Sequence, residues 1–151
     1  SLKALTTGGS NVGVGFAALE ANTTASSNTA IGFTALLSNT TGAENTAVGA
    51  NSLDANTTGG NLAAVGMHSL GGNTTGNNNS ALGHGALLVN TTGSGNTAVG
   101  MASLDANTTA DNNVAIGYAS LTSNTTGATN TSVGTLSLPE NHTASHNTGV
   151  G

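Results

Sequence analysis

The chain has 151 residues, of which only 5% are charged, and one lysine and six carboxylates give it a formal net charge of −5. One basic residue and an aromatic content of 2% exclude the cationic, stacking surface of a nucleic-acid-binding protein and the basic patch of a protein that binds anionic membranes. No apolar run approaches the roughly 18 residues of a membrane-inserted helix, and the absence of cysteine excludes disulfides and thiol chemistry.

One sequence unit repeats along the whole chain without insertion or deletion. Its period, the interval from Gly15 to Gly32, is marked by nine glycines, Gly15, Gly32, Gly49, Gly66, Gly83, Gly100, Gly117, Gly134 and Gly151. The units begin at Asn11, Asn28, Asn45, Leu62, Asn79, Asn96, Asn113, Asn130 and Asn147. A unit this short cannot bury a core alone, so each is expected to form one coil of a stacked array. We predict one repeat array over residues 1–151, an excerpt of a longer array, with about nine coils.

Within each unit the expected elements follow a fixed order. A short strand comes first, as in Thr29-Ala30-Ile31, because small and β-branched residues alternate there. The glycine ends it, a second extended segment is expected from the leucine through Asn-Thr-Thr, and a glycine-rich trio such as residues 59–61 closes the coil. No stripe of helical period exists. The sequence therefore predicts an all-β fold, a β-solenoid in which each coil is one 17-residue unit.

Slots that hardly vary are expected to face the coil interior or a tight corner. One holds leucine in every unit, and the slot before the glycine is always aliphatic, so both are predicted to form the apolar column of the rod. Beside the aliphatic slot lies a row of small residues where a second chain could approach closely: Ala30, Ala47, Ala64, Ala81, Ala98 and Ala115. This row predicts a homotrimer, with a lone solenoid or an end-to-end helical filament as the alternatives.

An asparagine followed by Thr-Thr or His-Thr recurs near the end of each unit and fits the acceptor pattern for N-glycosylation. The eight candidates are Asn22, Asn39, Asn56, Asn73, Asn90, Asn107, Asn124 and Asn141, and Asn78 and Asn130 match as well. If they are modified, the rod carries a line of sugars. The alternative is a stacked amide ladder in which the acceptor pattern is a by-product of repetition.

The spacing of the repeat does not bring together side chains for catalysis or for metal binding. Asp54 and Asp105 share a slot but lie three coils apart, roughly 14 Å at the usual strand spacing, which is too far for an acid–base pair. His68 and His84 fall in neighbouring coils and can approach each other, but a third ligand for a metal is missing. We expect no enzyme activity, no metal and no cofactor.

The unit Asn-Thr-Ala-Val/Ile-Gly-x-x-Ala/Ser-Leu-x-x-Asn-Thr-Thr-Gly resembles the repeats of bacteriophage-type tail-fibre proteins and of trimeric autotransporter adhesin heads of the YadA-like β-roll type. The resemblance covers residues 2–151. Because the adhesin heads carry a comparable Val-Ala-Ile-Gly strand in each coil, it implies a left-handed β-roll that assembles as a trimer.

The function expected from these patterns is mechanical. The chain is predicted to be a structural segment of an extracellular fibre, filament or adhesin, at the cell or virion surface, with itself, glycans or a cell-surface carbohydrate as partners. The alternative is a binding module whose flat Thr/Asn face recognises ice or carbohydrate. Its threonines would form two columns, one from Thr23 to Thr125 and one from Thr24 to Thr143.

Overall fold

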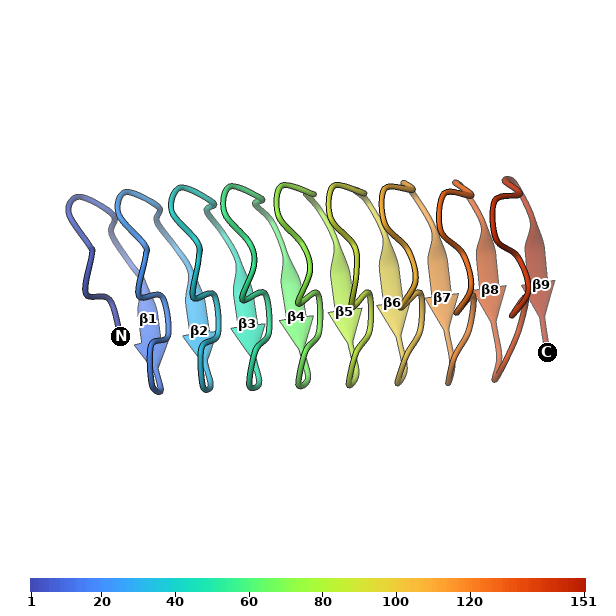
Figure 1. The fold of residues 1–151 in the computed structure, drawn as a ribbon, viewed down its shortest axis with the longest axis horizontal. Helices are drawn as coiled ribbons and strands as arrows, with labels where there is room; N and C mark the ends of the chain where they lie inside the picture. The colour runs from blue at the N-terminus through green and yellow to red at the C-terminus, as the bar shows by residue number, and fades with distance from the viewer.

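The computed structural model describes all residues from Ser1 to Gly151 and contains nine strands of three residues each. They are β1 (Val12–Val14), β2 (Thr29–Ile31), β3 (Thr46–Val48), β4 (Ala63–Val65), β5 (Ser80–Leu82), β6 (Thr97–Val99), β7 (Val114–Ile116), β8 (Thr131–Val133) and β9 (Thr148–Val150). The strands pair in parallel and in chain order in a single sheet (Figure 1). Every strand residue pairs with the equivalent residue of the next unit, as Val12 does with Thr29. The predicted β-solenoid is confirmed.

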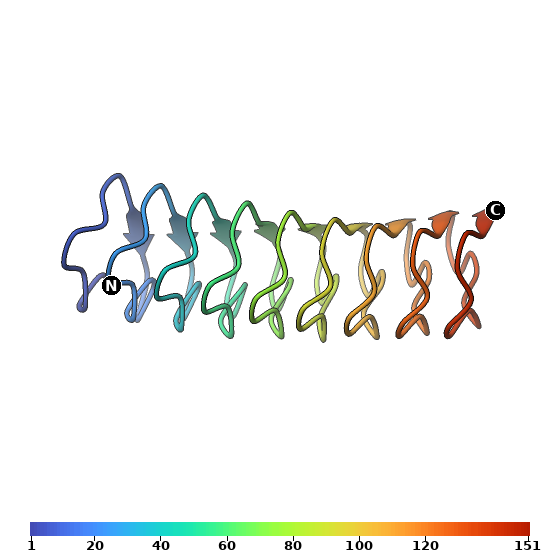
Figure 2. The ribbon, with the colours of Figure 1, turned by 90° about the horizontal axis from the view of Figure 1, so that it is seen from above.

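The coils stack along one axis, so the molecule is a rod with its termini at opposite ends (Figures 1 and 2). With a spacing of about 4.8 Å between neighbouring strands, the nine strands extend over roughly 40 Å. The fold has no helix of the length and apolar character that crossing a bilayer requires. Because each coil contacts only the coils beside it, the rod is held together by contacts that repeat from one coil to the next.

The segment from the leucine through Asn-Thr-Thr is not a strand, so that expectation is wrong. Thr34 and Leu36 both have left-handed backbone, with φ of 52° and 51°, and this conformation bends the chain twice within three residues. The segment nevertheless bonds to the next coil, since the N–H of Leu36 donates to the carbonyl oxygen of Ser52 at 3.0 Å. Of 93 backbone hydrogen bonds, only 16 join strand residues to each other, and most of the other 77 link neighbouring coils, so the segments outside the strands hold the coils together more than the sheet does.

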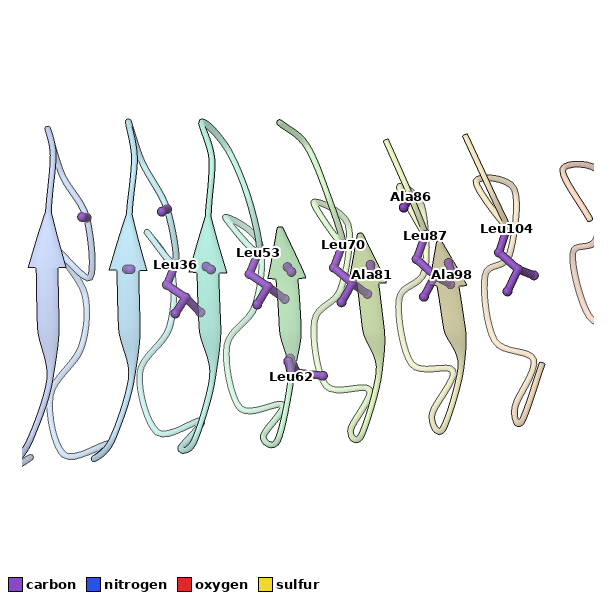
Figure 3. Close-up of a cluster of buried hydrophobic side chains, with 14 of the residues drawn as sticks. Leu36, Leu53, Leu62, Leu70, Ala81, Ala86, Leu87, Ala98 and Leu104 are labelled. Atoms are coloured by element: carbon purple, nitrogen blue, oxygen red, sulfur yellow. The ribbon is translucent and has the colours of Figure 1, made fainter. Parts of the chain in front are cut away.

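A column of leucines fills the centre of the coils (Figure 3). These fully buried residues are Leu19, Leu36, Leu53, Leu70, Leu87, Leu104 and Leu121. The middle residue of each strand faces them, as Ala81 and Ala98 do in Figure 3. The space between is small: a Cβ added to Gly149, the middle residue of β9, would lie only 2.6 Å from Leu138 Cγ. Opposite the leucine, the middle strand position therefore takes only a small residue, which is alanine in most coils and serine at Ser132.

The aliphatic slot faces outward, which corrects the prediction that it belongs to the core. Side chains alternate across a strand, so the inward alanine in the middle position turns the first and third residues to the surface. Ile31, Val65 and Leu82, each the third residue of its strand, are exposed, whereas Ala30, Ala64 and Ala81 are buried. The apolar core is thus a Leu/Ala column, and the Val/Ile column covers the outside of the sheet.

The repeating glycine is required where the strand ends. Gly66 has φ of 135°, and a Cβ there would lie 2.5 Å from the carbonyl oxygen of Gly83 in the next coil. Gly32, Gly49, Gly83, Gly100 and Gly117 show the same close approach. Both the backbone conformation and the packing between coils exclude a side chain at this slot.

Candidate interaction surface

The rod has no pocket, so its candidate functional sites are its faces. The most regular of them is the outside of the sheet. We define the sheet face as the outward first and third residues of β1 to β9. The third residues are all aliphatic, and the first are threonine in β2, β3, β6, β8 and β9 and small or aliphatic in the other strands. Its outward residues form columns along the rod, because each strand pairs in register with the next.

A second column of exposed side chains follows the glycines. We call it the flanking column; its members are Phe16, Phe33, Ala50, Met67, His84, Met101, Tyr118 and Thr135. The rings of Phe16 and Phe33 stack with their centroids 5.4 Å apart, and Phe16 is 70% exposed. The sheet face and the flanking column contain most of the large apolar side chains that the rod exposes. Contiguous exposed apolar surface of this kind marks interaction sites.

Charged residues are absent from both of these columns. Lys3, Glu20, Asp54 and Asp105 share one slot beyond the leucine, and Glu140 occupies the next. Glu44 and Asp111 lie at the turn that closes the coil. Like charges therefore do not oppose each other when two copies of the sheet face meet, although the chain as a whole is acidic.

The row of alanines predicted to contact another chain lies inside the coil. Ala30, Ala47, Ala64, Ala98 and Ala115 have no exposed surface, and Ala81 has 3%. All six pack in the core cluster with the leucines. The prediction that this row is a chain contact is wrong. The middle residue of each strand points into the coil, whereas the prediction placed it on the surface.

The asparagines of the Asn-Thr-Thr motif also lie inside the rod. Seven of them, from Asn22 to Asn124, are completely buried, and Asn141 is half-buried in the last coil. Nδ2 of Asn56 donates to Oδ1 of Asn39 at 2.9 Å and to the carbonyl oxygen of Gly59 at 3.0 Å. The same pair of bonds recurs from Asn39 to Asn141, which gives an unbroken amide ladder.

This ladder decides between the two interpretations of the motif. N-glycosylation replaces a hydrogen of the amide nitrogen by a bulky sugar on the surface. In the asparagines from Asn39 to Asn124 both amide hydrogens are used inside the rod, and the buried nitrogen of Asn22 donates to the carbonyl oxygen of Ala25. The prediction of a glycosylated face at Asn22, Asn39, Asn56, Asn73, Asn90, Asn107 and Asn124 is therefore wrong for the folded chain. Asn130 is buried too, and Asn78 is the single asparagine with an acceptor pattern that is exposed.

The two threonines of the motif have different environments. The hydroxyl of the first bonds to the next coil, as Thr57 Oγ1 donates to the carbonyl oxygen of Thr74 at 3.0 Å, and its side chain is half-buried. The second threonine is exposed in every coil from Thr24 to Thr143. The two predicted threonine columns are thus one structural column and one outward column.

The two histidines whose spacing allows them to approach each other lie close together. The ring centroids of His68 and His84 lie 6.3 Å apart with the rings edge to face. No three residues among the histidines and carboxylates come close enough to hold a metal ion together.

Comparison with protein-family models, with curated proteins and with solved structures finds no match. Sequence reasoning missed the sheet face. The signal that could have found it is the alternation in each strand, where a small residue stands between two larger ones and so points to the narrow interior.

Proposed function

We propose that this chain is a rod-shaped structural segment of an extracellular fibre, filament or adhesin, and that copies of it assemble side by side through the sheet face. The observation that carries the proposal is the aliphatic column that runs along the entire exposed side of the sheet. Val14, Ile31, Leu82 and Ile116 expose between 40% and 55% of their surface there. Fully burying an exposed side chain of this kind contributes about 1.5–3 kcal/mol, so each of these half-exposed side chains gains roughly half of that when a partner covers it.

The partner that fits this face best is a second copy of it. Residues with the same spacing lie in register when two rods align, so each aliphatic side chain meets one from the partner. The face is free of charge, so the acidity of the chain does not oppose the contact. Three chains arranged around a common axis bury all their sheet faces, and we take the trimer as the state of the fibre.

The experiment places lysines on the sheet face. Leu82→Lys combined with Ile116→Lys puts two charges on the outward side of β5 and β7, where neither side chain is in the core. The matched control, Thr92→Lys with Thr126→Lys, has the same spacing in the exposed threonine column. By sedimentation equilibrium, the original chain and the control should be trimers, and the Leu82/Ile116 variant should be monomeric with unchanged circular dichroism. A monomeric original chain at tens of micromolar would overturn the proposal.

The rival function is a binding module for ice or carbohydrate. It is favoured by one observation, the outward column of eight threonines at the constant coil spacing from Thr24 to Thr143. The asparagines cannot belong to such a face because they are buried. Measurement of thermal hysteresis and of ice-crystal shape tests the ice version, and replacing Thr58, Thr75 and Thr92 by lysine should abolish any effect that this column produces.

A further inference from the structure

Both methionines of the chain and two of its four histidines gather at one place on the rod. Met67, His84 and Met101 are successive members of the flanking column, and all three are exposed. Backbone hydrogen bonds hold their coils in register, since the N–H of Gly85 donates to the carbonyl oxygen of Met67 at 3.1 Å and that of Ala102 to His84 at 3.0 Å. The methionines therefore lie on either side of His84, each on the adjacent coil, with about 4.8 Å between neighbouring backbones.

His68 completes the group from the neighbouring slot. Its ring centroid is 6.3 Å from that of His84, and the residue at the slot of His68 in the next coil is Gly85. A Cβ at Gly85 would meet no atom within 4 Å, so no side chain fills the slot that lies one coil along from His68. With a metal–nitrogen bond of about 2 Å, two imidazoles on one ion have their ring centres roughly 5–6 Å apart. A small side-chain rotation brings both rings to that distance.

We propose that Met67, His68, His84 and Met101 form a binding site for a soft monovalent cation, Cu(I) or its analogue Ag(I). Thioether sulfur is a weak ligand for Zn²⁺ or Mg²⁺ but suits Cu(I), and imidazole binds copper as well. The three rotatable bonds of methionine let each sulfur reach an ion held by His84. The cluster contains no carboxylate and no cysteine, so thioethers are its third and fourth ligands, which sets its selectivity for a soft ion.

The site is tested with Ag(I), added as the nitrate in chloride-free buffer, because silver does not change its oxidation state during the titration. Isothermal titration and native mass spectrometry should show one ion per chain, and the imidazole NMR signals of His68 and His84 should shift while those of His142 and His146 do not. His84→Asn should weaken binding more than tenfold, since even the loss of a residue that only supports a ligand costs about 10- to 100-fold.

The controls separate this site from weak binding elsewhere. His142→Asn removes a histidine outside the cluster and should leave the affinity unchanged. The double variant Met67→Leu/Met101→Leu keeps size and apolarity, so it should lower Ag(I) affinity at least tenfold while leaving the weaker binding of Zn²⁺ unaltered. Equal affinities of the double variant and the original chain for Ag(I), or loss of binding with His142→Asn, would overturn the proposal. Circular dichroism of each variant verifies that the coil structure is retained.

Discussion

The side-chain amide of Asn73 donates to the side-chain oxygen of Asn56, 2.9 Å away in the preceding coil, and its own oxygen accepts the amide of Asn90 at 2.9 Å. Each asparagine from Asn39 to Asn124 thus bonds both neighbouring coils as well as a glycine or alanine carbonyl of its own turn. The repeated polar motif is a buried structural element, although its composition is typical of a solvent-exposed loop.

Replacement of Asn73 by alanine should interrupt this ladder. It leaves Asn56 Oδ1, one of the two amide hydrogens of Asn90 and the carbonyl oxygen of Gly76 without a partner inside the rod. Since a buried polar group without a partner costs about 1–3 kcal/mol, the free energy of unfolding should fall by roughly 3 kcal/mol or more. Urea denaturation followed by circular dichroism measures it. Thr75→Ala, two residues away and exposed, should change stability by less than about 0.5 kcal/mol.

Glycosylation should be confined to Asn78. When the chain is produced by a glycosylating secretory host, the folded product should carry at most the sugar of this exposed site and none at the seven buried asparagines from Asn22 to Asn124. Intact-mass spectrometry measures the added mass, and Asn78→Gln should remove it. Sugars at several positions on a chain that retains its native circular dichroism would contradict the buried ladder.

The glycine that ends each strand should tolerate no side chain. Gly66→Ala places a Cβ 2.5 Å from the carbonyl oxygen of Gly83 and forces an alanine to φ of 135°, so it should cost at least about 2 kcal/mol. Gly85→Ala in the next coil is the matched control. There φ is 64° and the space is open, and alanine already occupies this slot at residues 17, 102 and 119. Thermal unfolding should show a much smaller loss for Gly85→Ala than for Gly66→Ala.

One substitution should stabilise the rod. Thr129 is exposed and has φ of 58°, a conformation that is unfavourable for a β-branched residue. Gly95 occupies the same slot two coils earlier with φ of 70°. Thr129→Gly should therefore raise the free energy of unfolding by about 0.5–1 kcal/mol, since the relief of left-handed strain exceeds the entropy cost of glycine. Thr126→Gly, also exposed but without positive φ, should lower stability; if both variants lower it equally, strain at Thr129 is not significant.

The period of the repeat was enough to predict the coil, its length and the leucine column. Stacked coils must place equivalent residues beside each other, so an uninterrupted interval such as that from Val12 to Thr29 leaves no other register. The direction of Ala30 and Ile31 was not predicted correctly, because apolarity alone assigns the larger residue to the core. The decisive quantity is the width of the interior, which Leu36 already fills from the opposite side.

The turns could not be predicted from residue propensities either. Leucine rarely adopts φ near 50°, and the residues around Leu36 do not indicate that the chain bends there. On the surface of the rod, the repeat spacing correctly placed His68 near His84. Met67 and Met101 occupy the same slot as His84 in neighbouring coils, but methionine is a rarer metal ligand than histidine or a carboxylate, so the pattern alone did not indicate a site that includes them.

The register of the coils has a consequence for how such a rod can change in evolution. A single inserted residue within one coil would shift its asparagine, leucine and glycine against the matching residues on both sides, and would break several buried ladders at once. Removing or duplicating a whole coil leaves every contact of the same kind in place. Length variants of this rod should therefore differ by whole coils and never by a fraction of one, so its length changes in steps of one coil spacing.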